Sequence, residues 1–209
     1  DRTSRGLGDV YKRQLFGNQP DVRKTATSNF KHHGERIYLV GTTYDELGAS
    51  EVAFHLRERG EVSGIGGQVP LLENPEVQLE VYRKLSTAIQ SGLIRTAHDC
   101  SEGGLAIALA EMCIGGRCGA FIDIDGIGPG DAFSRLWSES LGRIVVSVEA
   151  EHEVAFVEMM EGADLHLIGM VSASSELLIE DGYDTLIQAD VEQLTESWKG
   201  ALDMTGVVE

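Results

Sequence analysis

The chain has 209 residues, of which 42% are hydrophobic, and its formal net charge at pH 7 is −17. This apolar content suits a globular core and excludes a fully disordered chain. The strong negative charge excludes a phosphate-backbone grip on nucleic acid without a local basic patch. No run approaches the roughly 18 apolar residues that span a bilayer. We therefore expect a protein with neither nucleic-acid nor membrane partners.

The first 14 residues differ from the rest of the chain in charge. They carry four Lys or Arg against two Asp or Glu, in a chain that has 17 against 34 overall. Residues 9–14 also resemble the in-frame translation of a transposase adaptor used in sequencing libraries. We predict that residues 1–14 are a non-native, disordered segment and that the natural protein extends upstream of Leu15. An ordinary basic N-terminal arm is the alternative.

The first elements after this segment are short. Residues 15–31 are polar and mixed. A β-branched and aromatic run ended by glycine predicts a strand over 36–41. A turn-rich segment follows, then a predicted short helix over 51–59. The glycines of 63–67 predict a flexible loop.

The next helix has the clearest sequence signals. Asn74 is a plausible N-cap, Pro75 suits the first helical position, and Gly92 supplies the C-terminal stop. Apolar residues at helical spacing predict the buried face; they are Val77, Val81, Leu85, Ala88 and Ile89.

The rest of the chain alternates predicted helices and strands. Further helices are expected over 102–112, 131–137, 151–160 and 191–202. Further strands are expected over 120–125, 143–148, 165–171 and 177–179. This alternation predicts an α/β or α+β layered domain, with a mixed sheet flanked by helices.

One segment combines a carboxylate with a helix start. A loop holding His98 and Asp99 is predicted to lead into a helix whose first turn contains Gly103 and Gly104. Free N–H groups at a helix N-terminus favour anions, and glycines let a phosphate approach the backbone. Asp99 is then placed to bind a magnesium ion shared with that phosphate.

A purely structural interpretation of the same segment stays open. Ser101 is a good N-cap, and Glu102 in the first turn complements the helix dipole. The glycines would then only permit close packing between the helix and a strand. His98 would be a hydrogen-bonded structural histidine.

The other titratable residues give weaker signals. The adjacent His32 and His33 are predicted to be solvated, because no partner ligand has a suitable spacing. The three cysteines, Cys100, Cys113 and Cys118, are odd in number and lack metal-type spacing. They predict reduced, inert thiols in a cytoplasmic protein.

Four stretches of the sequence are distinctive when taken in order: 29–41, His98 to Met112 with its His-Asp-Cys-Ser-Glu-Gly-Gly-Leu start, Trp137 to Arg143 with Ser-Glu-Ser, and Trp198 to Leu202. Together they resemble the PurL-type phosphoribosylformylglycinamidine synthases of the small form, which belong to the aminoimidazole ribonucleotide (AIR) synthetase superfamily. The resemblance covers nearly everything after Gln14. It implies an AIR-synthetase-type C-terminal domain over 46–209. Residues 15–45 would be the C-terminal edge of a truncated ATP-binding-type domain.

The resemblance also implies a function. Enzymes of this family make the amidine of formylglycinamide ribonucleotide in de novo purine biosynthesis, using ATP, Mg²⁺ and ammonia delivered from glutamine. They look like duplicated proteins, and this chain resembles the second, supporting half. It would therefore be a scaffold fragment, inactive alone and without catalytic residues of its own. Its expected partners are the upstream domains of the same protein, a separate glutaminase subunit and a small accessory subunit.

The resemblance further implies a ligand-binding pseudo-site in this half. Asp99 matches a magnesium-binding aspartate of the first half, and Ser138 to Ser140 matches a stretch that contacts substrate there. The candidate ligand-binding residues are Asp99, Ser101, Gly103, Gly104, Ser138, Glu139, Ser140 and Arg143, with Asp99 also as a metal ligand. Leu141 and Gly142 depart from the polar residues of the first-half motif, which weakens the case for substrate binding.

Structural roles are again the alternative for this group. Ser138 would end a helix, and Arg143 would pair with Glu139 or another carboxylate near the surface, for little energy. Two other functions also stay open. One is the C-terminal domain of a selenophosphate synthetase or hydrogenase-maturation protein, against which the 137–143 stretch and Trp198 argue. The other is a non-enzymatic ligand-binding module. In the fragment hypothesis, an exposed apolar face is expected where the upstream domains would pack.

Overall fold

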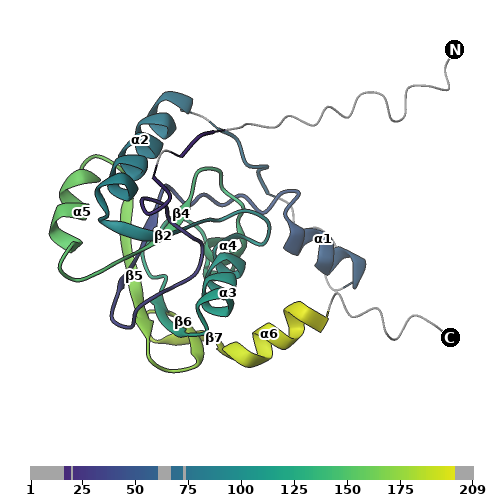
Figure 1. The fold of residues 1–209 in the computed structure, drawn as a ribbon. Helices are drawn as coiled ribbons and strands as arrows, with labels where there is room; N and C mark the ends of the chain where they lie inside the picture. Colours follow the sequence, from purple (N-terminus) through teal and green to yellow (C-terminus); the bar gives the residue numbers. More distant parts are fainter. Residues whose placement is uncertain (1–16, 20, 61–66, 73, 201–209) are drawn as a thin grey trace, which may run out of the picture.

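The computed structural model describes residues 17–19, 21–60, 67–72 and 74–200, which form six helices and seven strands (Figure 1). The helices are α1 (Glu51–Glu58), α2 (Pro75–Ser91), α3 (Gly104–Gly116), α4 (Ala132–Trp137), α5 (Glu153–Met159) and α6 (Val191–Gly200). The strands are β1 (Arg36–Val40), β2 (Ile94–Asp99), β3 (Gly119–Asp123), β4 (Ile144–Val148), β5 (Leu165–Ser172), β6 (Glu176–Asp181) and β7 (Asp184–Asp190). The predicted non-native segment 1–14, most of the predicted loop 63–67 and the expected end of the last helix lie outside the described residues.

All seven strands form one mixed sheet in the order β2-β4-β1-β5-β3-β6-β7. Neighbouring strands are antiparallel, except for β3 and β6, which run parallel. β1 pairs with β4 on one side and β5 on the other. The strand from segment 15–45 therefore lies inside the same sheet as the strands of 46–209, and the boundary between these two segments stays a prediction.

Helices lie on both faces of the sheet. Successive side chains of β1 point to opposite faces of the sheet. Ile37 and Leu39 belong to the core beneath α3 and α4, whereas Tyr38 and Val40 belong to the core beneath α2 and α5. In Figure 1, α2 and α5 lie together on one side of the sheet, and α3 and α4 lie on the other. The expected layered α+β architecture is confirmed.

α2 follows its sequence signals closely, with one exception. It begins at Pro75 and ends before Gly92, whose φ of 79° is the left-handed conformation that favours glycine. Val81, Leu85 and Ala88 are buried, as predicted. The prediction was wrong for Val77, which is 62% exposed because it lies in the first turn, beyond the edge of the sheet-facing stripe. Asn74 occupies the N-cap position without a side-chain capping bond.

Two strands escaped the sequence analysis, and both lie at the ends of the sheet. β2 contains His98 and Asp99, which were expected in a loop, and its ladder partner is β4. β7 pairs with β6 and has mostly exposed side chains. An end strand is not buried on both sides, so it does not need the regular apolar alternation that identifies a central strand. None of the helices in the described ranges is long and apolar enough to cross a membrane.

Candidate functional site

The candidate site begins at the connection between β2 and α3, and the structure of this connection differs from the prediction. Ser101 does not cap the helix; its hydroxyl donates a hydrogen bond to Asp99 Oδ2. α3 starts at Gly104 rather than at residue 102, and Gly103 is the N-cap with a φ of 79°. Gly104 also has a positive φ, of 64°. Two consecutive left-handed residues require glycine, because a β-carbon there would collide with the following carbonyl.

Gly104 is also required for close packing. A β-carbon on Gly104 would lie 2.5 Å from the carbonyl oxygen of Ser138 and 2.7 Å from that of Leu136. The start of α3 is therefore pressed against the backbone at the end of α4. This geometry agrees with the structural interpretation of Gly104, since a glycine there permits close packing between α3 and the end of α4.

Glu139 occupies the position at which an anion was expected. Its Oε1 accepts hydrogen bonds from the backbone N–H of Gly103 and from that of Glu51, both at 2.9 Å. These two groups belong to the N-termini of α3 and α1. A carboxylate is favourable at the positive end of a helix, and here a single carboxylate serves two helices. The helix N-terminus does attract an anion, and in this structure that anion is the chain's own side chain.

The two serines beside Glu139 are fully buried and bonded within the chain. Ser138 Oγ accepts the N–H of Glu46 at 3.1 Å, and Ser140 Oγ accepts the N–H of Tyr44 at 3.0 Å. Ser138 is also the C-cap of α4, as the structural alternative predicted. Both hydroxyls therefore hold the segment between β1 and α1 against the end of α4.

Arg143 is the largest fully buried side chain, with 1% of its surface exposed. It donates to Thr43 Oγ1 at 3.1 Å, to the Arg135 carbonyl at 3.4 Å and to the Ser138 carbonyl. The structural alternative, an ion pair of Arg143 with Glu139 or another carboxylate near the surface, is not found among the described residues, because the guanidinium points inward and Glu139 turns to the helix ends. Burial lowers the pKa of Arg143, and the nearby Glu46 acts in the opposite direction.

A cavity of about 370 Å³ lies beside this network and brings several predicted residues together. Asp99, Ser101, Glu139 and Arg143 line it, along with Glu102. The Asp99 side chain is 73% exposed. Its hydrogen bond from Ser101 is the main reason that the pKa of Asp99 lies below its usual range. Asp99 is therefore ionised at neutral pH and accessible to solvent.

The cavity does not fit a nucleotide phosphate. Its lining carries three carboxylates, and Arg143, its cationic member, donates its bonds inward. The N–H of Gly103 is already bonded to Glu139. Asp99 belongs to none of the groups of three potential metal ligands found among the described residues. The magnesium role of Asp99 and the ligand roles of its neighbours stay predictions, and we derive no chemical step through a metal or nucleotide at this point.

His98 takes part in a different environment. Its Nε2 lies 3.0 Å from Glu111 Oε2 on α3, and its Nδ1 lies 2.8 Å from the Asp99 carbonyl oxygen. It lines a larger cavity, of about 820 Å³, whose walls include Arg117 and Trp198. This cavity could not be predicted from the sequence, because β2, α3 and α6 meet there only after folding.

The family model described as "AIR synthase related protein, C-terminal domain" matches residues 32–181. The chain belongs to this family. The match includes the His98 to Met112 stretch and the Ser-Glu-Ser stretch on which the resemblance was based.

Solved structures with the same fold include chains of PurL from T. maritima. The complex with FGAR is similar with a TM-score of 0.69 and 16% identity, over 82% of this chain and 29% of that one. The complex with ATP gives a TM-score of 0.63 and 18% identity, over 81% and 27%. The hydrogenase maturation protein HypE gives a TM-score of 0.54 and 12% identity, over 79% and 55%. At these identities the likeness shows a shared fold, and this chain spans less than a third of the length of the PurL chains.

Proposed function

We propose that this chain is a supporting C-terminal domain of a PurL-type, ATP-dependent formylglycinamide ribonucleotide amidotransferase, and that it performs no chemistry alone. The observation that carries the proposal is the way the candidate ligand groups are used. Ser138, Glu139, Ser140 and Arg143 direct their polar atoms at the chain's own backbone and side chains. A domain whose polar groups stabilise its own structure is suited to support the neighbouring domains of the enzyme.

The family stretches and the fold comparison support the PurL assignment over the hydrogenase-maturation alternative. The PurL complex with FGAR is more similar in fold than HypE is. The Trp137 to Arg143 stretch and Trp198 favour the same choice. In this proposal the whole enzyme uses ATP and Mg²⁺ at its other domains and acts in the cytoplasm. Ammonia comes from a separate glutaminase subunit, and a small accessory subunit completes the complex.

An exposed apolar face of the sheet supports a docking role. α2 and α5 cover the β2-β4-β1 end of one face. Further along that face, Leu167 and Met170 on β5, Phe121 on β3 and Leu186 on β7 expose a third or more of their surfaces. Phe121 and Met170 are directly paired in the ladder. We propose that the upstream domains of the same protein pack on this surface, because patches of this kind usually mark interaction sites.

Recovery of the upstream coding sequence gives the direct test. An ATP-binding-type half should directly precede Leu15. The full-length protein should then amidate formylglycinamide ribonucleotide with ATP, Mg²⁺ and ammonia, measured as ADP release that depends on that substrate. The isolated 209-residue chain should show no turnover. Activity of the isolated chain, or a full-length protein inactive with this substrate, would overturn the proposal.

The predicted role of Asp99 has a separate test. If the cavity beside Glu139 binds a magnesium nucleotide in the full-length protein, Asp99→Ala should weaken that binding in calorimetry. Glu102→Ala is the matched control, because Glu102 lines the same cavity and no hydrogen bond or ion pair of its side chain occurs within the described residues. Equal affinities of the wild type and Asp99→Ala would remove Asp99 from any such site.

A further inference from the structure

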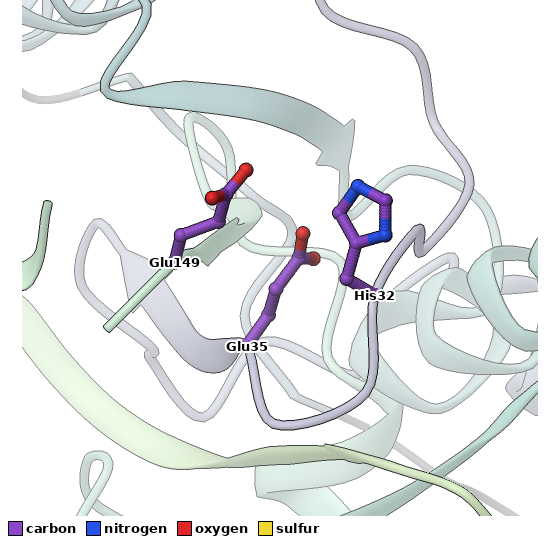
Figure 2. A group of neighbouring side chains, drawn as sticks. All are labelled: His32, Glu35 and Glu149. Carbon is purple, nitrogen blue, oxygen red and sulfur yellow. The ribbon is translucent and has the colours of Figure 1, made fainter. Parts of the chain in front are cut away.

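A cluster of three potential metal ligands lies away from the candidate site, at the end of the sheet where β1 begins and β4 ends. His32 and Glu35 are the first and last residues of a tight turn, in which the N–H of Glu35 bonds to the carbonyl of His32. Glu149 directly follows β4. One ligand atom from each of His32, Glu35 and Glu149 lies within 4.8 Å of the other two. Figure 2 shows the three side chains side by side, with Glu35 between His32 and Glu149.

Glu35 is the unusual member of this cluster because it is a buried carboxylate, with 5% of its residue surface exposed. Among the described residues its carboxylate accepts one hydrogen bond, from Ser147 Oγ to Oε2, and forms no ion pair. Its other oxygen, Oε1, accepts no hydrogen bond in the same part of the chain and keeps some contact with solvent, since it is not among the buried atoms without a partner. Burying a carboxylate is costly unless it is paired or binds a metal, and in Figure 2 the Glu35 carboxylate lies between His32 and Glu149.

The local charges point to a cation. Glu149 brings a second carboxylate next to Glu35, and like charges at this separation repel. Lys31 acts on Glu35 through its charge, but its ammonium group is engaged with Thr27 Oγ1, the Asn29 carbonyl and Thr96 Oγ1. A divalent ion bound by both carboxylates would remove the repulsion and bind the Glu35 oxygen that Ser147 leaves open.

The ligand types indicate which cation fits. One imidazole nitrogen and two carboxylate oxygens, with water in the remaining position, form a mixed set that suits Zn²⁺. Mg²⁺ prefers oxygen ligands alone. Ligand atoms about 2.1 Å from a tetrahedral ion lie about 3.4 Å apart, so rotation of the exposed His32 ring toward the two carboxylates completes the arrangement.

We propose that His32, Glu35 and Glu149 bind one Zn²⁺ ion, which holds the segment before β1 to the end of β4. The adjacent Glu151 and His152 form a second group of potential ligands that shares Glu149. This site could not be predicted from the sequence, in which no partner ligand of His32 has a suitable spacing, because Glu149 is brought near His32 only by the pairing of β1 with β4.

Titration of the full 209-residue chain with ZnCl₂ in calorimetry tests this site. The wild type should bind one equivalent of Zn²⁺ in preference to Mg²⁺. At a free Zn²⁺ concentration of about 100 times the Kd, the Tm should rise by about 5 to 10 °C. His32→Gln and Glu149→Gln should each weaken binding by about tenfold or more, and should reduce the Tm rise in parallel.

The neighbouring exposed histidine provides the matched control. His33 bonds to the Ser172 carbonyl oxygen outside the cluster, so His33→Gln should bind Zn²⁺ like the wild type. Both test variants change side chains that are not buried, which keeps the fold intact for the measurement. The absence of Zn²⁺ binding by the wild type would overturn the proposal. So would undiminished binding by His32→Gln and Glu149→Gln, since the ion would then lie elsewhere.

Discussion

Replacement of Glu139 by alanine tests the central feature of the candidate site. The carboxylate accepts the first N–H groups of α1 and α3, each at 2.9 Å. The bond from Gly103 is partly buried and the bond from Glu51 is exposed. A hydrogen bond of either kind contributes about 1 kcal/mol to the free energy of unfolding. The favourable charge at two helix ends adds about 0.3 kcal/mol or more. We therefore expect Glu139→Ala to lower the free energy of unfolding by about 2 kcal/mol.

Urea denaturation followed by circular dichroism gives this free energy. Glu139→Gln separates the hydrogen bonds from the charge, because the amide oxygen still accepts both N–H groups. It should lose less than half of what Glu139→Ala loses. Glu102→Ala removes a neighbouring exposed carboxylate and should change the stability by less than about 0.5 kcal/mol.

Glu139→Ala should also gain a property that can be measured, the binding of an anion at the start of α3. Once the carboxylate is gone, the N–H of Gly103 becomes available to an anion. Inorganic phosphate should then raise the Tm of Glu139→Ala more than that of the wild type. A loss below about 0.5 kcal/mol in Glu139→Ala would show that the two bonds do not stabilise the protein in solution. An equal response to phosphate in both proteins would show that the carboxylate does not occupy an anion position.

Three further predictions follow from neighbouring parts of the structure. Gly104→Ala should destabilise the protein by about 3 kcal/mol in urea, from positive-φ strain and collision with the Ser138 carbonyl. Gly162→Ala has similar φ strain in open space and should lose about 1 kcal/mol, so equal losses would refute the packing argument. Arg143→Met should lower the free energy of unfolding by about 3 kcal/mol, because it leaves buried acceptors without a donor and removes the cation near Glu46. A loss under about 1 kcal/mol would contradict this prediction. Burial raises the pKa of Cys100 to about 11 and that of Cys113 to about 12. The folded protein then keeps these protons while the unfolded chain loses them above about pH 9, so the free energy of unfolding should fall from pH 9 to 11. Rapid reaction of these two thiols with Ellman's reagent at pH 8 without denaturant would contradict that assignment.

The sequence determined much of the fold through local and periodic signals. α2 follows from Pro75, Gly92 and apolar residues at helical spacing, which act within one helix whatever surrounds it. The positions of β1 and β4 could be predicted from runs of apolar, β-branched residues, because a strand that is buried on both faces has apolar side chains on both. β2 and β7 were missed, since strands at the ends of the sheet carry ordinary polar residues.

The family could also be predicted from the sequence, because its stretches are contiguous runs of residues. The roles of individual side chains could not. Ser101 has the type and position of an N-cap, but its hydroxyl turns back to Asp99 once Gly103 and Gly104 take left-handed conformations. Nothing local to Glu139 shows that its carboxylate meets Gly103 and Glu51, which are 36 and 88 positions away.

The sequence by itself therefore determined the layered fold, its principal elements and the family to which the chain belongs. Only the tertiary structure decided that the carboxylate at the start of α3 is Glu139, and that His32, Glu35 and Glu149 meet at one end of the sheet. The physical reason is the range of the forces involved. Helix caps and apolar periodicity act over a few residues. The partner of a polar group depends on which distant segments the packed core brings within about 3 Å of it.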